Sequence, residues 1–279
     1  MNYSSPLPWD ARFSSRSPLF APLAAAAAEL QHCAHWPAIH ELNNLLLRHR
    51  LLTGGGVPLA FVAADRISPE ASPGYEPRAY LSGELETRVG NWHDLFNALV
   101  WLSFPKAKAA INARHHHALQ LASVTQRRST DRDALTLFDE SGVIVACDDP
   151  ALLALVENFA WKELFWRRRE EVLARMRFYV FGHGLYEKAL RPFIGLTGKA
   201  VLLPVDGEFL GAWLPAQMAI LDDRLATLIA QGLRHTHELH PLPVLGIPGC
   251  SEDNAREAYY DNRDYFRPGR RKSATALPS

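Results

Sequence analysis

The sequence has few cysteines and no excess of charge of either sign. Its three cysteines lie far apart in the 279 residues, without the paired spacing of a disulfide framework or a zinc knuckle. We therefore expect a reducing, cytoplasmic environment. Lysine and arginine number 30 together and are balanced by 30 aspartates and glutamates. That balance excludes a uniformly basic surface for nucleic acid.

Long apolar runs are also missing. A membrane-spanning helix needs roughly 18 uninterrupted apolar residues, and Lys106 and Lys108 interrupt the nearest candidate. The first residues have no cationic segment followed by an apolar one, and the run Ala24 to Ala28 ends at Glu29. We expect a soluble protein with no secretory signal.

The overall composition is that of an ordinary globular chain with one unusual count. Hydrophobic residues make up 48% and charged residues 22%, so a sizeable core can form. The length is within reach of one core. We expect a single globular domain over residues 1–266 and a basic tail without fixed structure over residues 267–279. The unusual count is histidine, with 12 residues, many of them clustered.

Helical patterns dominate the chain. In the segment from Trp92 to Phe104, apolar residues recur at helical spacing behind Asn91, a good N-cap residue. Similar patterns predict helices over residues 17–31, after Pro37, from Pro105, from Asp148 or Asp149 through Trp166, and over residues 215–230.

The strands are expected to be short. Between Ala134 and Ala146 the sequence reads ALTLF, DESG and VIVA, which we interpret as a β-hairpin with a four-residue connection. Further strands are expected over residues 178–181 and 200–205, and an irregular, proline-rich arm after Gly232. The predicted fold is α+β: a mostly helical single core with a small β-hairpin or sheet and an irregular C-terminal arm.

Four segments together resemble a known family. They are NWHDLFNALVWLSFPKAKAAIN (91–112), RDALTLFDESG (132–142), FGHGLYEKAL (181–190) and PLPVLGIPG (241–249). They are similar to the uncharacterised bacterial family called domain of unknown function 3025, and the resemblance covers nearly the whole chain. It implies a bacterial cytosolic protein of a single architecture and adds no catalytic assignment.

The first candidate for chemistry is the pair His93 and Asp94 at the start of an apolar helix. Imidazole and carboxylate together can hold a divalent ion that activates water, as in metal-dependent phosphohydrolases of the HD type. That class also needs an upstream histidine, for which His35 or His40 would serve, and a later aspartate, for which Asp131, Asp133 or Asp139 would serve. In the alternative, Asp94 interacts with the helix dipole and His93 makes a buried hydrogen bond.

The second candidate is His183 with Glu187, four residues apart. If a helix begins at His183, both side chains face one side, where they can chelate a metal or let the carboxylate orient the imidazole. The flanking Gly182 and Gly184 would let the backbone approach a ligand closely. A plain strand-to-helix turn is the alternative.

Other polar clusters are expected to be structural. Asp139 and Glu140 fall in the connection of the expected hairpin, where aspartate commonly bonds its own backbone. Successive histidines of a helix point about 100° apart, so the triplet 115–117 cannot present three ligands to one ion. It is expected at a solvated helix end. The histidines at 235, 237 and 240 are expected in a solvated loop.

The leading hypothesis is a metal-assisted hydrolase of a phosphate-containing small molecule or nucleotide, with a divalent metal ion as cofactor. His93, Asp94 and His183 would bind the metal. His183, Glu187 and Asp94 would be the catalytic groups. Arg132 or Lys162 would contact the anionic substrate.

Two alternatives remain open. One is a non-catalytic binding or scaffold protein that docks a partner on the arm at residues 241–249. The other is RNA association through residues 167–169 and the basic tail, although Glu170 and Glu171 make that helix surface mixed and nucleic-acid binding unfavoured. A separation of more than about 10 Å between His93 and His183 would exclude a shared metal, because ligands bond it near 2 Å.

Overall fold

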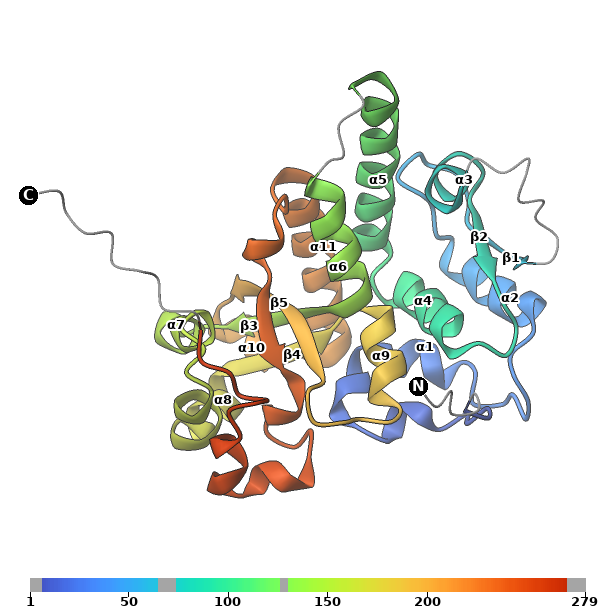
Figure 1. The fold of residues 1–279 in the computed structure, drawn as a ribbon. Coiled ribbons are helices and arrows are strands. Elements are labelled where there is room, and N and C mark those ends of the chain that lie inside the picture. The colour runs from blue at the N-terminus through green and yellow to red at the C-terminus, as the bar shows by residue number, and fades with distance from the viewer. Residues whose placement is uncertain (1–6, 65–73, 126–129, 270–279) are drawn as a thin grey trace, which may run out of the picture.

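The computed structural model describes residues 7–64, 74–125 and 130–269, with side chains described except at 122–125 and 130–132 (Figure 1). The α-helices are α1 Ala24–Ala28, α2 Ile39–His49, α3 Tyr75–Ser82, α4 Trp92–Ser103, α5 Pro105–Thr125, α6 Thr130–Ser141, α7 Pro150–Glu157, α8 Arg169–Arg175, α9 His183–Ala189, α10 Gly207–Gly211 and α11 Leu214–Gln231. The strands are β1 Ala60–Ala63, β2 Glu84–Thr87, β3 Gly142–Cys147, β4 Met176–Val180, β5 Thr197–Pro204 and β6 His240–Pro243. The fold is α+β and helix-dominated, as predicted.

The larger sheet has the order β4-β3-β5-β6, with β3 antiparallel to β4 and parallel to β5. Every residue of β3 is buried. A continuous apolar run of this kind suits a strand covered on both faces. A second sheet pairs β1 and β2 in parallel. The buried apolar residues form one cluster that extends from Phe13 to Phe266.

The predicted hairpin between Ala134 and Ala146 is wrong in its first half. Residues 130–141 form α6, and only the VIVA segment is a strand. Ala134, Leu135 and Phe138 are buried. Leu135 and Phe138 follow Ala134 by one and four positions, which places all three on one face of a helix. A short apolar run such as ALTLF is compatible with both a helix and a strand. Tertiary packing decided in favour of the helix.

Several helix boundaries are confirmed by their caps. The Asn91 side chain accepts a hydrogen bond from the backbone N–H of Asp94 at 3.1 Å, and Asp149 accepts one from Ala151 at 2.8 Å. The helix after Asp149 ends at Glu157, short of the predicted Trp166. Phe159 follows with a left-handed φ of 58°, and residues 163–167 form a π-helical turn.

The prediction of a solvated helix end at histidines 115–117 is wrong. The triplet lies within α5, and His115 and His116 are only 4% and 6% exposed. Both α3 and α11 pack against α5 (Figure 1), and the ring of His116 stacks on Tyr80 with centroids 4.3 Å apart. Burial and the neighbouring His117 lower the pKa of His116, so its ring is neutral in the core. His235 and His237 are exposed, as expected. The prediction of a solvated loop is wrong for His240, which begins β6 and is half-buried.

The irregular arm is confirmed over residues 232–269. It contains β6 and short 3₁₀-helices at Thr236–Glu238, Val244–Gly246, Glu252–Ala255 and Glu257–Asp261. Most of the predicted tail, residues 270–279, lies outside the described residues. No helix in the described ranges is long and apolar enough to cross a membrane.

The junction between β4 and α9 rests on the junction between α6 and β3. The backbone N–H groups of Phe181 and Gly182 both donate to the carbonyl of Gly142, at 2.9 and 3.0 Å. On its other side α9 packs against α4, where Tyr186 stacks on Phe96 with centroids 5.6 Å apart. Figure 1 shows α4 beside α9. These contacts bring the start of α4, the end of α6 and the start of α9 together.

We predict that Gly182→Ala destabilises the protein by about 1–3 kcal/mol, the usual cost of an overpacked site. A Cβ at Gly182 would lie 2.4 Å from the backbone nitrogen of Ser141 and 2.5 Å from that of Gly142, and neither backbone atom can move aside cheaply. Urea unfolding would measure the change. Gly211→Ala is the control, since no atom lies within 4 Å of its added Cβ. Equal unfolding midpoints for the two variants would contradict the prediction.

Candidate functional site

Three helix ends place two histidines and a carboxylate around one point. His93 lies in the first turn of α4, His183 begins α9, and Glu140 lies in the last turn of α6. The Nε2 atoms of the two histidines are 3.1 Å apart. Oε1 of Glu140 lies 3.4 Å from Nε2 of His183 and 3.8 Å from Nε2 of His93. The two candidate histidines therefore share one site, although 90 positions separate them in the sequence.

The three atoms have the spacing of metal ligands. Imidazole nitrogen and carboxylate oxygen bind Zn²⁺ at about 2.0–2.2 Å. Separations of 3.1, 3.4 and 3.8 Å leave a point about 2 Å from all three atoms. The group can therefore hold a divalent ion with coordination positions left open.

Each histidine has a second carboxylate near its other ring nitrogen. Nδ1 of His93 donates to Oε2 of Glu187 at 3.0 Å, which leaves Nε2 of the neutral ring with its lone pair. Nδ1 of His183 faces Oδ2 of Asp139 at 3.6 Å and has no hydrogen-bond partner within the described part of the chain. Metal-binding histidines commonly have such carboxylates behind them. The bond to Glu187 raises the pKa of His93 against the opposing effect of burial.

Asp139 is held by a buried lysine. Lys108 of α5 is 4% exposed, and its Nζ lies 2.6 and 2.9 Å from the two carboxylate oxygens of Asp139. The same ammonium donates to Oδ1 of Asn97 at 2.9 Å. Burial alone would raise the pKa of Asp139, but Lys108 and then His183 outweigh it and the pKa is lowered. Asp139 therefore stays ionised next to His183.

Asp94 does not join the metal-ligand group, although we expected it to be a ligand. Its carboxylate accepts hydrogen bonds from Nε and Nη2 of Arg88, each at 2.8 Å, and from the backbone N–H of Arg88 at 2.8 Å. Burial of Asp94 acts to raise its pKa, and the bonds from Arg88 outweigh it, so the pKa lies below its ordinary value. Asp94 serves to hold Arg88 at the edge of the site.

The group lies in a cleft of about 350 Å³. The residues that line it are Tyr75, Glu76, Glu86, Arg88, His93, Asp94, Asn97, His115, Thr136, Asp139, Glu140 and His183. Among these described residues Arg88 supplies the cationic side chain. Most of the carboxylates have partners of their own, since Arg78 binds Glu86 at 2.7 Å and Arg88 and Lys108 bind Asp94 and Asp139. Of the other two carboxylates, Glu76 accepts a hydrogen bond from the amide of Asn112 at 2.7 Å, and Glu140 lies at the histidine pair.

One of the two predicted anion contacts, Lys162, is bound away from this cleft. The ammonium of Lys162 binds Glu257 at 3.0 Å and Asp261 at 2.7 Å, in the C-terminal arm. Arg132 belongs to α6, and its side chain lies outside the described residues.

The sequence predicted Asp139 and Glu140 in a hairpin turn, and it offered Asp139 only as one of three candidates for the later aspartate of an HD-type site. A signal for the helix was present: Thr130 precedes Asp133 by three positions, the spacing of a capping box ahead of an apolar run. On a helix, Asp139 and Glu140 follow the buried Phe138 into the last turn. Nothing local in the sequence pointed to Lys108, whose role depends on a contact 31 positions away.

The glycines around His183 have steric roles. A Cβ at Gly184 would lie 2.3 Å from Oε2 of Glu140. Gly184 therefore makes room for Glu140 above the start of α9, whereas we had expected close approach of a ligand.

Comparison with known proteins places the chain in a family. The profile described as "Protein of unknown function (DUF3025)" matches residues 59–270. The chain belongs to this family. His93, Glu140, His183 and Glu187 all lie inside the match to DUF3025. No curated protein and no solved structure matches the chain, so the function of this DUF3025 member rests on the chemistry of its site.

We predict that Lys108→Met destabilises the protein by about 3–5 kcal/mol, because the Asp139 carboxylate would be left buried without its partner. Urea unfolding at neutral pH would measure the loss. Lys106→Met is the matched control, because Lys106 forms a comparable pair with Asp223 in which both side chains are 60% exposed. Its unfolding midpoint should stay close to that of the wild type. An unchanged midpoint in Lys108→Met would overturn the role given to the buried pair.

We also predict that Arg88→Ala raises the pKa of Asp94, because the two guanidinium hydrogen bonds and the positive charge that lower it would be lost while burial, which raises it, remains. In the wild type the folded-state pKa is depressed. The pair therefore stabilises the fold at pH values above 3.8, and this contribution is lost as the pH falls through the folded-state pKa. NMR titration of the Asp94 carboxyl carbon would show the shift. Substitution of the exposed Arg234 by alanine should leave the titration unchanged.

Proposed function

We propose that this protein is a metal-dependent hydrolase that acts on a phosphate-containing small molecule or nucleotide. The divalent ion would be bound by Nε2 of His93, Nε2 of His183 and Oε1 of Glu140. The observation that carries the proposal is the convergence of these three atoms, with a carboxylate behind each histidine. Two histidines and one glutamate are a ligand set of catalytic zinc sites, which keep a further position for water.

The arrangement supports hydrolysis through a metal-bound water. A divalent ion lowers the pKa of bound water toward neutrality and so supplies a nucleophile. Glu187 holds the proton of His93 on Nδ1 and directs Nε2 at the ion. Asp139 lies behind His183, kept ionised by Lys108. The volume of the cleft, about 350 Å³, suits a small substrate.

Substrate binding would depend on the metal ion. The cleft is rich in carboxylates, so an anion would bind poorly without added positive charge. A phosphate oxygen bound to the ion would be stabilised directly. Arg88, which is 59% exposed and fixed by Asp94, would be the nearby cation. Arg88 would then have the role that the sequence had suggested for Lys162, whose ammonium is bound in the C-terminal arm.

The scaffold alternative is not favoured by the contacts of the C-terminal arm. Leu242, Val244, Leu245 and Ile247 are all buried in this chain's own core. Their apolar side chains are therefore not free to dock a partner.

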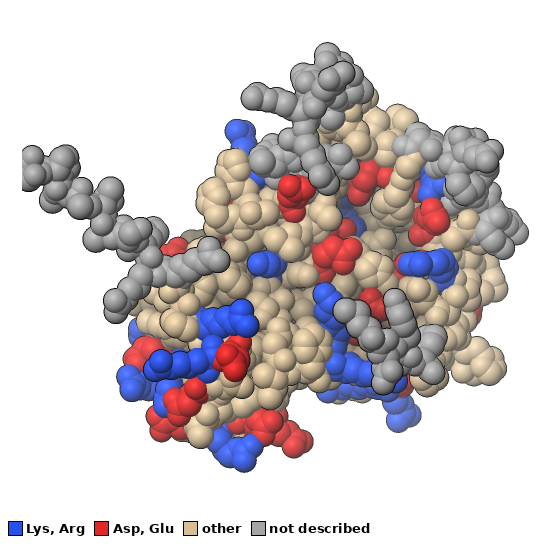
Figure 2. Space-filling view, in the orientation of Figure 1, with Lys and Arg blue, Asp and Glu red and all other residues tan. Residues whose placement is uncertain are grey.

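We do not extend the proposal to nucleic acid, because the charges are mixed. Figure 2 shows acidic and basic side chains interspersed on the face drawn. The arginines at 167–169 bind within the chain: Arg167 pairs with Glu163, Arg168 with Glu171, and Arg169 donates to the carbonyl of Asn254.

We place the hydrolase in the cytoplasm, as a further part of the proposal. Cys33, Cys147 and Cys250 are all free thiols, which suits a reducing compartment. Burial raises the pKa of Cys147, with the carboxylates of Asp148 and Asp149 as further causes, so this thiol is inert.

Metal binding and hydrolysis should be lost together when a ligand is removed. The chelator-treated protein would be titrated calorimetrically with Mn²⁺, Zn²⁺ and Fe²⁺, then assayed on a panel of phosphomonoesters and nucleotides. We expect His93→Ala and Glu140→Gln to lower kcat/KM by more than about 100-fold, since even residues behind the ligands cost 10–100-fold. His235→Ala, in an exposed loop, is the control and should keep both properties.

The titrations should be repeated in a Cys33→Ser background. Metal bound through the Cys33 thiol, which belongs to a different group of possible ligands, is then not counted. If this variant binds no stoichiometric metal and its melting temperature does not respond to added Mn²⁺, Fe²⁺ or Zn²⁺, the proposal fails, because a ligand of the native state must stabilise it. Metal binding without hydrolysis of any compound in the panel would reject the hydrolase and leave a metal-binding protein.

A further inference from the structure

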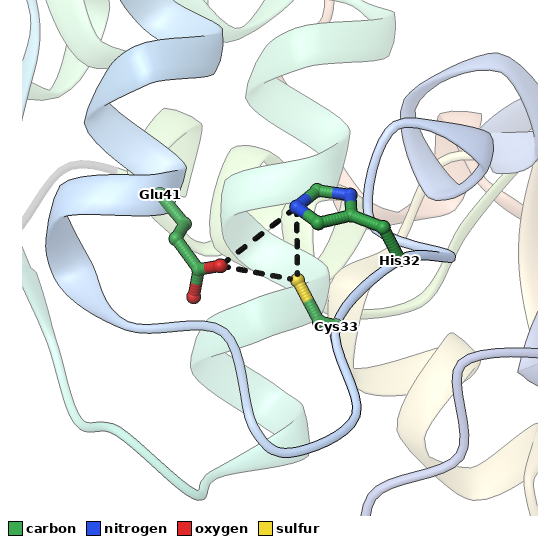
Figure 3. A group of neighbouring side chains, drawn as sticks. All are labelled: His32, Cys33 and Glu41. Carbon is green, nitrogen blue, oxygen red and sulfur yellow. Dashed lines mark hydrogen bonds and ion pairs between the residues drawn. The ribbon is translucent and has the colours of Figure 1, made fainter.

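A second group of metal-binding side chains lies near the N-terminus, before the segment matched by the family profile. His32 and Cys33 lie in the segment after α1, and Glu41 lies in the first turn of α2. Figure 3 shows the three side chains directed toward a common point. Sγ of Cys33 is 3.7 Å from Nε2 of His32 and 3.4 Å from Oε1 of Glu41, and Nε2 of His32 is 3.8 Å from Oε1 of Glu41.

These separations match three ligands of one ion. Zn²⁺ binds cysteine sulfur at about 2.3 Å and histidine nitrogen or carboxylate oxygen at about 2.0–2.2 Å. A point about 2 Å from all three atoms exists. A point slightly closer to the nitrogen and the oxygen than to the sulfur allows sulfur its longer bond.

The backbone around the group holds two of the ligands in place. Oε2 of Glu41 accepts the backbone N–H of Ala38 at 2.7 Å, which fixes the carboxylate and leaves Oε1 toward Cys33. The carbonyl of Cys33 accepts a hydrogen bond from Nε1 of Trp9 at 2.8 Å. Cys33 is 7% exposed, whereas the side chain of His32 is 70% exposed. Cys33 therefore lies on the buried side of the group and His32 on the side open to solvent, from which an ion can enter.

We propose that His32, Cys33 and Glu41 form a transition-metal site, best suited to Zn²⁺, that is separate from the site at His93 and His183. The thiolate decides the class of ion, because sulfur ligands select zinc and other soft transition metals over Mg²⁺, Ca²⁺ and Mn²⁺. The site at His93 offers nitrogen and oxygen ligands alone. The two sites therefore differ in metal preference, and neither depends on the other.

A reactive thiol is the competing role for Cys33, and its surroundings oppose it. Burial, together with the hydrogen bond and charge of Glu41, raises the pKa of Cys33 to about 11. At neutral pH the thiol stays protonated and is a weak nucleophile. A bound cation reverses this effect, since a coordinating thiol loses its proton to the solvent as the sulfur–metal bond forms.

An occupied site would join the segment at residues 32–33 to the first turn of α2. Glu41 already caps this helix through Ala38. Metal binding would tie residues 32–33 to this first turn more firmly than the contact between Cys33 and Glu41 at 3.4 Å, and it would raise the melting temperature with metal concentration.

Co²⁺ titration followed by absorption spectroscopy tests the inference, because only a thiolate ligand produces a near-ultraviolet sulfur-to-cobalt charge-transfer band. In the Glu140→Gln background, which removes a ligand of the other proposed site, we expect a band that saturates at one Co²⁺ per chain and is displaced by Zn²⁺. Cys33→Ser should abolish it. His32→Ala and Glu41→Gln should each weaken binding by more than about 10-fold. Cys250→Ser is the matched control and should keep the band.

Absence of the band in the wild-type protein, or its persistence in Cys33→Ser, would overturn the proposal. If Cys33→Ser does not fold, His32→Ala decides, because its side chain is largely exposed and circular dichroism can confirm its fold. Glu140→Gln should retain the band, and His32→Ala should retain any hydrolytic activity. Failure of the hydrolase proposal and failure of this site are therefore distinguishable.

Discussion

The carbonyl of Gly142 organises the centre of this protein. It accepts hydrogen bonds from two successive backbone N–H groups, those of Phe181 and Gly182. Because a Cβ at Gly182 would lie within 2.5 Å of the Ser141 and Gly142 nitrogens, the two chain segments can approach only with glycine there. This contact sets the end of α6 against the start of α9. Packing of Tyr186 on Phe96 then adds the start of α4. The histidine pair is a consequence of these backbone and aromatic contacts.

At the site, the partner of each carboxylate depends on how deeply that carboxylate is buried. The more buried carboxylates have cations of their own: Lys108 for Asp139 and Arg88 for Asp94. The more exposed carboxylates, Glu140 and Glu187, lie on the histidines. A buried ion needs a partner of opposite charge, whereas an exposed carboxylate is solvated by water and stays available to a ligand. The carboxylates of Glu140 and Glu187 thereby place negative charge at the histidine pair, which favours a cation there.

The two metal-binding groups differ in chemistry and in construction. The group at His93 joins three helices from distant parts of the chain and has carboxylates behind both histidines. The group at Cys33 is local, formed by residues 32–41, and contains sulfur. The local group depends on the segment between α1 and α2 and on the contact with Trp9, while the distant one requires the packing of α4, α6 and α9. The ligand geometry of the group at His93 is therefore more sensitive to the packing of the whole protein than that of the group at Cys33.

Local sequence determined the features that depend on neighbours along the chain. Asn91 and Asp149 were recognisable as caps, the helical stripes were readable, and His93 and His183 stood out as isolated histidines beside carboxylates. Tertiary structure alone decided which carboxylates join them. Asp94, adjacent in sequence, is bound by Arg88, while Glu140, which had been assigned to a turn, lies at the histidines. The physical reason is that convergence at the site comes from helix packing and close backbone approach, contacts between segments about 90 positions apart that leave no periodic pattern in the sequence.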